Sequence, residues 1–263
     1  MKSSRRLPAE LAIAIALAFL APLCAQPAPD AFTVAATAEP AIERASLRAG
    51  DAEFAAALAP LAAALAAEPK NPALLYTRAY AHYAAVPALR AKKNSPAAIA
   101  ELEKAAALLD RVRGQPWEAE AAALHSGILG QLISLKGGLA GMTLGGKSAA
   151  LIDRAEKSLP NSPRVLYFRG LYLFNTPTAF GGDRALGVKL LAQSAAAFVT
   201  AESAFPGPRW GRAEALTWLG LAHQKAGDLP AARAAWDQAL ALEPDYGWVK
   251  FALLPSLLQK PAP

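Results

Sequence analysis

The sequence predicts an all-α protein, built as one solenoid of antiparallel helix pairs. Three observations support this fold class. Strong helix formers, above all Ala and Leu, fill the long runs of the chain, whereas runs of β-branched residues are few. Pro and Gly mark the breaks between these runs. One kind of break recurs, in which a helix end is followed by Pro and a polar residue, at Glu68-Pro69, Leu159-Pro160 and Glu243-Pro244.

The breaks divide the chain into five helix pairs and a capping helix. Each pair leaves an apolar face that only a neighbouring pair can cover, so the pairs form one cooperative domain over residues 39–259. The Pro- and Ala-rich residues 26–38 are expected to be a disordered lead-in. We predict the pairs over residues 40–67, 72–112, 116–159, 163–205 and 211–242, and the capping helix over residues 246–259.

Local signals place the helices within these pairs. In the first pair, a short helix from Pro40 ends at Gly50-Asp51, and a second helix runs to about Ala67. In the third pair, apolar residues spaced i, i+4, i+8 and i+11 indicate a helix from about Trp117. These apolar residues are Leu124, Ile128, Leu132 and Leu135.

The first 25 residues have the features of a secretory signal peptide. A start with three basic residues is followed by an apolar run over residues 11–21, which is too short to span a bilayer as a stable helix. A loop-like stretch then predicts cleavage after Ala25. We therefore expect a periplasmic or secreted protein with no stable membrane span after cleavage. An uncleaved anchor, or lipid attachment to Cys24, is the alternative.

Composition excludes several classes of function. Cleavage after Ala25 would remove Cys24, the one cysteine of the chain, and with it any disulfide, Cys metal site or Cys nucleophile. The chain has 27 basic and 21 acidic residues, and these are interspersed rather than grouped in blocks. Neither nucleic acid nor an anionic membrane is therefore indicated as a partner.

The most informative stretch is Ala213–Pro244, where two apolar helical runs meet at Gly227-Asp228. Small residues lie where the two helices would touch, at Gly220, Ala232 and Ala239. This pattern resembles a tetratricopeptide repeat (TPR), a helix–turn–helix of about 34 residues. Further positions typical of the repeat are filled by Leu219, His223, Trp236 and Pro244. The resemblance implies a binding scaffold rather than a catalyst.

Further motifs extend the resemblance over residues 137–254. They include NSPR at residues 161–164, FGGD at residues 180–183 and the run from Pro244 to Lys250. Together they look like a family of exported bacterial TPR-like proteins, which implies a secreted α-solenoid and no particular reaction. A weaker resemblance is to the TPR subunit found with some periplasmic substrate-binding transport systems, which implies a transport accessory.

Residues 141–148, GMTLGGKS, match the pattern of the phosphate-binding P-loop. That loop needs a preceding β-strand so that its backbone N–H groups converge on a phosphate. The preceding residues predict a helix instead, and the chain has no alternating strands from which to build a parallel sheet. We interpret the match as a Gly-rich connection between two helices and expect no nucleotide cofactor.

The three histidines, His82, His125 and His223, all lie inside predicted helices. No second His or carboxylate lies beside any of them at the spacing of metal ligands. We interpret them as core or groove residues rather than as metal ligands or general bases. The Gly-x-Ser-x-Gly motif of a nucleophilic serine is absent as well, so the sequence predicts no catalytic residue, no metal and no cofactor.

A stripe of tyrosines is the best functional signal. Tyr76, Tyr80 and Tyr83 share one helix face because they are spaced i, i+4 and i+7. In TPR folds the first helix of each pair lines a concave groove, and Tyr offers stiff contact area with a polar tip, which suits recognition. Packing between adjacent pairs is the alternative. The same alignment places in the groove Arg164, Tyr167, Asn175 and Gln224.

Phe180, Gly181, Gly182 and Asp183 give a second signal. Two glycines before an Asp predict a turn with positive φ, followed by a helix from Arg184 that the Asp caps. The segment is either a structurally specified loop or a loop that contacts a ligand.

These observations predict a non-catalytic periplasmic scaffold that binds a protein or peptide in a tyrosine-lined groove. The alternative is a transport accessory that binds or hands over a small apolar solute. A polar groove open at both sides would favour the scaffold, and a closed apolar chamber would favour the accessory.

Overall fold

The computed structural model describes residues 29–114, 117–201 and 207–258, and within these ranges all regular structure is helical. The predicted all-α solenoid is thereby confirmed. The helices are α1 (Ala31–Arg48), α2 (Asp51–Ala67), α3 (Pro72–Ala84), α4 (Val86–Ala91), α5 (Ser95–Leu109), α6 (Trp117–Lys136), α7 (Gly138–Ser158), α8 (Pro163–Asn175), η1 (Thr178–Phe180), α9 (Arg184–Ala201), α10 (Arg212–Lys225), α11 (Leu229–Leu242), η2 (Val249–Leu253) and α12 (Leu254–Ser256).

Five helix pairs stack in chain order: α1 with α2, α3 with α5, α6 with α7, α8 with α9, and α10 with α11. The short helix α4 is an insertion within the second pair. Among the described residues, no helix combines the length and the apolarity that crossing a bilayer requires.

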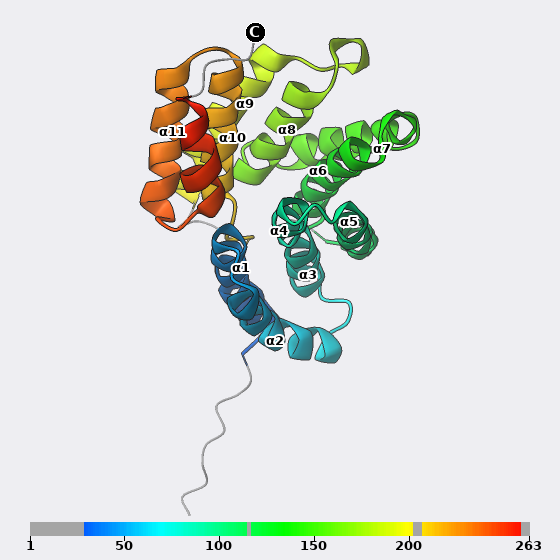
Figure 1. The fold of residues 1–263 in the computed structure, drawn as a ribbon. Helices are drawn as coiled ribbons and strands as arrows, with labels where there is room; N and C mark the ends of the chain where they lie inside the picture. Colours follow the sequence, from blue (N-terminus) through cyan, green and yellow to red (C-terminus); the bar gives the residue numbers. More distant parts are fainter. Residues whose placement is uncertain (1–28, 115–116, 202–206, 259–263) are drawn as a thin grey trace, which may run out of the picture.

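The solenoid curls round until its first helix meets its last repeat (Figure 1). Arg48 at the end of α1 forms an ion pair with Glu243 after α11, with 3.2 Å between Nη2 and Oε2. Leu47 is buried in the same apolar cluster as Trp236 and Tyr246. The two ends of the array are therefore in contact, and the concave side is enclosed instead of forming an open groove.

The predicted disordered lead-in is wrong from residue 31 onward. Asp30 accepts a hydrogen bond from the backbone N–H of Thr33 at 2.9 Å and so caps α1, which begins at Ala31. Pro40 lies inside this helix instead of starting one. A Pro there removes a helical hydrogen bond, but burial of the apolar face around Val34 and Ala38 offsets that loss. The predicted signal peptide, residues 1–25, lies outside the described residues.

The P-loop-like segment is not the connector that the sequence suggested. Residues 141–148 lie inside α7, and the turn from α6 falls earlier, at Gly137 with φ +88°. Helical backbone N–H groups are used by the helix itself and cannot converge on a phosphate. Lys147 instead forms an ion pair with Asp110, with 3.3 Å between Nζ and Oδ1.

The capping helix also differs from its prediction. Residues Val249–Leu253 form a turn of π-helix that leads into α12, which ends at Ser256. Pro255 has no N–H for the carbonyl four residues earlier, so regular α-helical bonding cannot continue through this segment.

The last repeat shows why small residues recur where helices touch. A Cβ added to Gly220 would clash with the indole ring of Trp236, which is fully buried. That indole donates a hydrogen bond from Nε1 to the carbonyl of Thr217 at 3.0 Å. The contact between α10 and α11 therefore depends on a residue without a side chain at position 220.

We expect Gly220→Ala and Gly146→Ala to have opposite effects on stability. The first should lower the free energy of unfolding by about 1–3 kcal/mol, because the new methyl group overpacks the site of Trp236. The second should raise it by about 0.5–1 kcal/mol, because Gly146 is helical and a methyl group there meets open space. Urea denaturation measures both. A loss of stability in Gly146→Ala would contradict the helical assignment of the P-loop-like segment.

Candidate binding site in the closed interior

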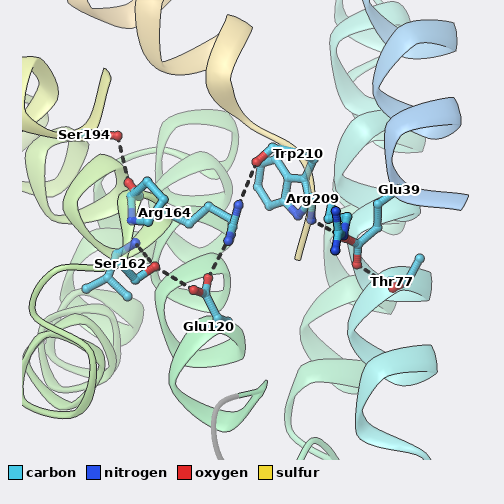
Figure 2. Close-up of polar contacts among 10 residues, drawn as sticks. Glu39, Thr77, Glu120, Ser162, Arg164, Ser194, Arg209 and Trp210 are labelled. Carbon is cyan, nitrogen blue, oxygen red and sulfur yellow. Dashed lines mark hydrogen bonds and ion pairs between the residues drawn. The ribbon is translucent and has the colours of Figure 1, made fainter. Parts of the chain in front are cut away.

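An irregular segment of the chain runs through the interior of the solenoid. Residues 207–211, called the strap below, connect toward α10 and are buried except for the exposed side chain of Arg209. Figure 2 shows the strap between α1 and α3 on one side and the side chains of Arg164 and Glu120 on the other. A buried segment without secondary structure must find other partners for its main-chain polar groups.

Two carboxylates of α1 bind the main chain of the strap. The backbone N–H of Arg209 donates to Oε2 of Glu39 at 2.6 Å, and that of Gly211 donates to Oε1 of Glu43 at 2.9 Å. The other oxygen of Glu39 accepts from the hydroxyl of Thr77 on α3 at 2.6 Å. The contact of Glu43 also caps α10, because Gly211 is the N-cap residue of that helix and has no side chain to do so.

The opposite wall binds a carbonyl group of the strap. Arg164 on α8 donates from Nη1 to the carbonyl oxygen of Trp210 at 3.0 Å and from Nε to Oε2 of Glu120 at 3.1 Å. Ser162 donates to the other oxygen of Glu120 at 2.6 Å. Arg164 and Glu120 are both buried, so the ion pair is stabilised by these added hydrogen bonds as well as by charge.

The side chain of Trp210 fills an aromatic pocket. Its ring stacks on that of Tyr80, with 4.0 Å between centroids and an interplanar angle of 16°. Tyr83 and Phe168 complete the pocket, each with its ring centroid 6.1 Å from that of Trp210. Trp210 thus anchors the strap from inside, and such ring pairs contribute beyond the apolar area that they bury.

Burial perturbs the ionisation of three carboxyl groups around the strap. It raises the pKa of Glu39 to about 7, although hydrogen bonds from Thr77 and the strap act in the opposite direction. It likewise raises the pKa of Glu43 to about 7. Burial and the neighbouring Glu43 raise the pKa of Glu214 to about 8, and Oε2 of Glu214 has no hydrogen-bond partner among the described residues. The interior therefore holds carboxyl groups that are easily kept neutral.

Arg164 is the cation that faces this acidic interior. Burial alone would lower its pKa, but Glu120, Tyr76 and Glu39 together raise it, so the guanidinium stays charged. This buried cation therefore faces several carboxyl groups. If all of these carboxyl groups were ionised, the enclosed structure would be destabilised.

The structure places the predicted groove residues in two environments. Tyr76, Tyr80, Tyr83, Tyr167 and Arg164 are brought together in the interior, but all five are buried. The tyrosine rings therefore lie in the core, as in the packing alternative, and do not line a groove that is open to solvent. The physical reason is the closure of the array, which places the strap and α1 over the concave face.

The other two predicted groove residues lie away from the strap contacts. Asn175 is exposed and donates from Nδ2 to the carbonyl of Leu171 at 2.9 Å, within α8. Gln224 is half-buried and donates from Nε2 to the hydroxyl of Ser256 at 2.9 Å, in the C-terminal segment.

The Gly-Gly loop has the structure that its sequence predicted. Gly181 has φ +88°, and Asp183 caps α9 by accepting the backbone N–H of Leu186 at 3.0 Å. A Cβ on Gly182 would collide with the carbonyl of Thr176, which explains the second glycine. Phe180 next to it is exposed. The loop is thus structurally specified, and its contact with a ligand stays a prediction.

The sequence reasoning missed the residues that bind the strap. Glu39 and Glu43 lie at the start of the predicted domain, just after the stretch interpreted as disordered, and Trp210 and Glu214 lie at the start of the last repeat. One signal could have found the first two: they are the acidic residues, spaced i and i+4, of an otherwise Ala-rich helix. Nothing in their spacing, however, says what lies opposite them.

Two of the three histidines, His82 and His125, lie near carboxyl groups of neighbouring helices. Nδ1 of His82 lies 2.5 Å from Oε2 of Glu101, within hydrogen-bonding distance, and burial lowers the pKa of His82. Glu101 also pairs with Lys104. His125 is buried, and burial together with nearby Lys147 lowers its pKa to about 4. Within the same described ranges, no group of three or more His, Cys, Asp or Glu side chains could hold a metal ion.

Comparisons with known proteins support the repeat and the fold. Residues 213–246 match the family model of the tetratricopeptide repeat. The crystal structure of TTC0263, a thermophilic TPR protein in Thermus thermophilus, is 19% identical with a TM-score of 0.52, over 84% of this chain and 100% of that chain. The HusA haemophore from Porphyromonas gingivalis is 22% identical with a TM-score of 0.47, over 72% of this chain and 94% of that chain. No curated protein matches the chain.

These comparisons establish a tetratricopeptide repeat at α10 and α11 and a TPR-like fold for the array. At such identities the likeness of structures concerns the fold alone, and a fold can serve many functions. Evidence for the function of this chain therefore comes from the residues of its interior.

The closed form should lose stability as the pH rises. A carboxyl group whose pKa is raised in the folded state binds its proton more tightly there than in the unfolded chain, so stability falls between about pH 5 and pH 8. We expect Glu214→Gln, which cannot ionise, to melt several degrees above the wild type at pH 8.5 and close to it at pH 5. Thermal melts over this range are the measurement. Glu53→Gln, at an exposed position, is the control, and an equal effect from it would contradict the assignment to burial.

Two substitutions of Tyr80 should separate its ring from its hydroxyl. Tyr80→Ala removes a fully buried ring that stacks on Trp210, and we expect a loss of about 3–5 kcal/mol in the free energy of unfolding. Tyr80→Phe should be neutral or stabilising, because the hydroxyl is buried without a hydrogen-bond partner among the described residues. Urea denaturation gives both values, and a mild effect of Tyr80→Ala would mean that the ring is accessible after all.

Proposed function

We propose that this protein is a non-catalytic scaffold in the periplasm that binds a segment of a partner protein on the concave side of its TPR-like solenoid. The observation that carries the proposal is the way in which the interior holds an irregular segment of chain. Side chains of α1 and α8 bind the main-chain groups of the strap from two sides, and an aromatic pocket takes one of its side chains.

This arrangement is the chemistry of peptide recognition. Main-chain hydrogen bonds hold a peptide whatever its sequence, and a pocket for one side chain adds specificity. A buried aromatic anchor in a well-packed pocket is the usual centre of such an interface. The tetratricopeptide repeat at residues 213–246 supports the same class of function.

The periplasmic location rests on the amino-terminal sequence. Its basic start, its apolar run and the loop-like residues after Ala25 support export followed by cleavage. The interspersed charges of the chain favour a protein partner over nucleic acid.

One observation favours the alternative, a transport accessory for a small apolar solute. A cleft of about 280 Å³ lies between α1, α2, α3, α4 and α5. Six alanines line it together with Phe54 and Leu89, and Asp51, Lys92 and Glu101 add charge to its lining. Small-molecule sites generally occupy about 300–1,000 Å³ and enclose most of the ligand, so this cleft suits only a very small solute. The interior is enclosed rather than open at both sides, but it is polar and already holds a segment of chain, so it supports the scaffold more strongly.

Site-specific photocrosslinking in intact cells tests the proposal. A crosslinking residue at Asn175, which is exposed on α8, should capture a partner, because α8 is the first helix of its pair and faces the concave side in a TPR array. The same residue at Gln193, exposed on α9, is the matched control. The protein should be recovered from the periplasmic fraction with Gln26 as its first residue.

Mass spectrometry of the crosslinked products identifies the partner. Capture from Asn175 and not from Gln193 is the expected result. Capture from neither position, or equally from both, would contradict a concave binding surface, and an intact Met1 would contradict export.

A further inference from the structure

We propose that the strap occupies the site that a partner segment binds, and that an extended partner segment with one aromatic residue can displace the strap from this site. This inference rests on the function proposed above and names the segment that the site recognises. The supporting observation is that the spacing of the two carboxylates of α1 matches the spacing of alternate N–H groups in an extended chain.

The two carboxylates of α1 have the spacing of alternate residues in an extended chain. Glu39 and Glu43 are four residues apart on a helix, which is about 6 Å along its axis. Residues two apart in an extended chain are about 6.6 Å apart, and their N–H groups point the same way. Accordingly, Glu39 binds the N–H of Arg209 and Glu43 binds that of Gly211.

The intervening residue is bound from the other wall, as an extended chain requires. The carbonyl of Trp210 points away from α1 and accepts from Arg164 on α8 (Figure 2). None of these three contacts uses a side chain of the strap. The site can therefore bind the main chain of another segment that has N–H groups at the two flanking positions and can adopt the positive φ of Gly211.

The strap itself contributes one side chain to the site. The ring of Trp210 is buried against Tyr80, Tyr83 and Phe168, whereas the side chain of Arg209 is exposed. The site therefore specifies an aromatic residue that is preceded by a residue other than proline and followed by glycine, because Gly211 has φ +107° and a Cβ there would lie 3.1 Å from the ring of Phe198. It is indifferent to the side chain before the aromatic residue.

A partner segment would reach the strap through the seam between α1 and the last repeat. The seam is formed by contacts between α1 and the last repeat, such as the ion pair of Arg48 with Glu243, whose arginine is partly exposed. An open seam would give a partner segment access to the strap and to the side chains that bind it.

The charges around the seam oppose permanent closure. Three carboxyl groups lie near the seam, those of the buried residues Glu39 and Glu214 and of the half-buried Glu43. Two further acidic residues, Glu120 and Glu243, act on them. The cations that act in the opposite direction are Arg164 and Arg44. Ionisation of the carboxyl groups near neutral pH therefore opposes closure, so the enclosed form holds the strap without excluding exchange.

Binding of a strap peptide tests the inference. The probe is a fluorescently labelled peptide with the sequence of residues 206–213, PGPRWGRA. We expect it to bind Trp210→Leu at least about tenfold more tightly than the wild type, because the weakened strap competes less. Trp248→Leu, which changes a tryptophan outside the strap, is the matched control and should behave as the wild type.

Substitutions in the peptide test the recognition rule. Proline in place of Arg209 or Gly211, and alanine in place of Trp210, should each weaken binding at least about tenfold, since they remove an N–H donor or the ring. Alanine in place of Arg209 should leave binding unchanged. Equal binding of the peptide to the wild type and both variants, or indifference to the proline substitutions, would overturn the inference.

Hydrogen exchange on the wild type gives an independent measurement if Trp210→Leu does not fold. Excess peptide should accelerate exchange of the strap's own amides at Arg209 and Gly211, and unchanged exchange would overturn the proposal. Crosslinking from Asn175 distinguishes the scaffold function from displacement of the strap. If Asn175 captures a partner but the strap is not displaced, the scaffold function is supported and only the displacement is refuted.

Discussion

The main-chain polar groups of the strap must be hydrogen-bonded, because the strap is buried and has no secondary structure of its own. This requirement organises the interior of the protein. It accounts for the two carboxylates of α1, Glu39 and Glu43, and for Arg164 on the opposite wall, each of which binds one main-chain group. It also accounts for the contact between the two ends of the array, since α1 must lie beside the start of the last repeat.

Closure of the array also has an electrostatic cost, because it removes carboxyl groups around the strap from water. Carboxyl groups taken out of water prefer to be neutral, and burial raises the pKa values of Glu39, Glu43 and Glu214 to between about 7 and about 8. The enclosed form is thus favoured by protonation and opposed by ionisation. A bound partner or a change of pH that alters the ionisation of these groups would therefore shift the population of the enclosed form.

The enclosed interior changes the meaning of the tyrosine stripe. In an open solenoid Tyr76, Tyr80 and Tyr83 would be exposed to solvent and available to a ligand. Here all three are buried, and the rings of Tyr80 and Tyr83 pack against Trp210. The rings therefore pack in the core, and the same rings would form the pocket that the proposed recognition uses. A partner that uses this surface must offer main-chain and aromatic contacts at least as good as those of the strap.

The sequence by itself determined the local structure of this protein. Pro, Gly and capping residues fixed most helix ends, and the small residue Gly220 marked the contact with Trp236, because these signals act over a few residues. Where local signals conflicted with packing they failed, as at Pro40 and in the glycine-rich start of α7, whose helical conformation depends on neighbours. Only the tertiary structure decided that the array closes and that Glu39, Glu43 and Arg164 hold the strap. Those contacts join residues more than 40 positions apart, and the periodicity of a helix shows which face a side chain occupies without showing what lies opposite it.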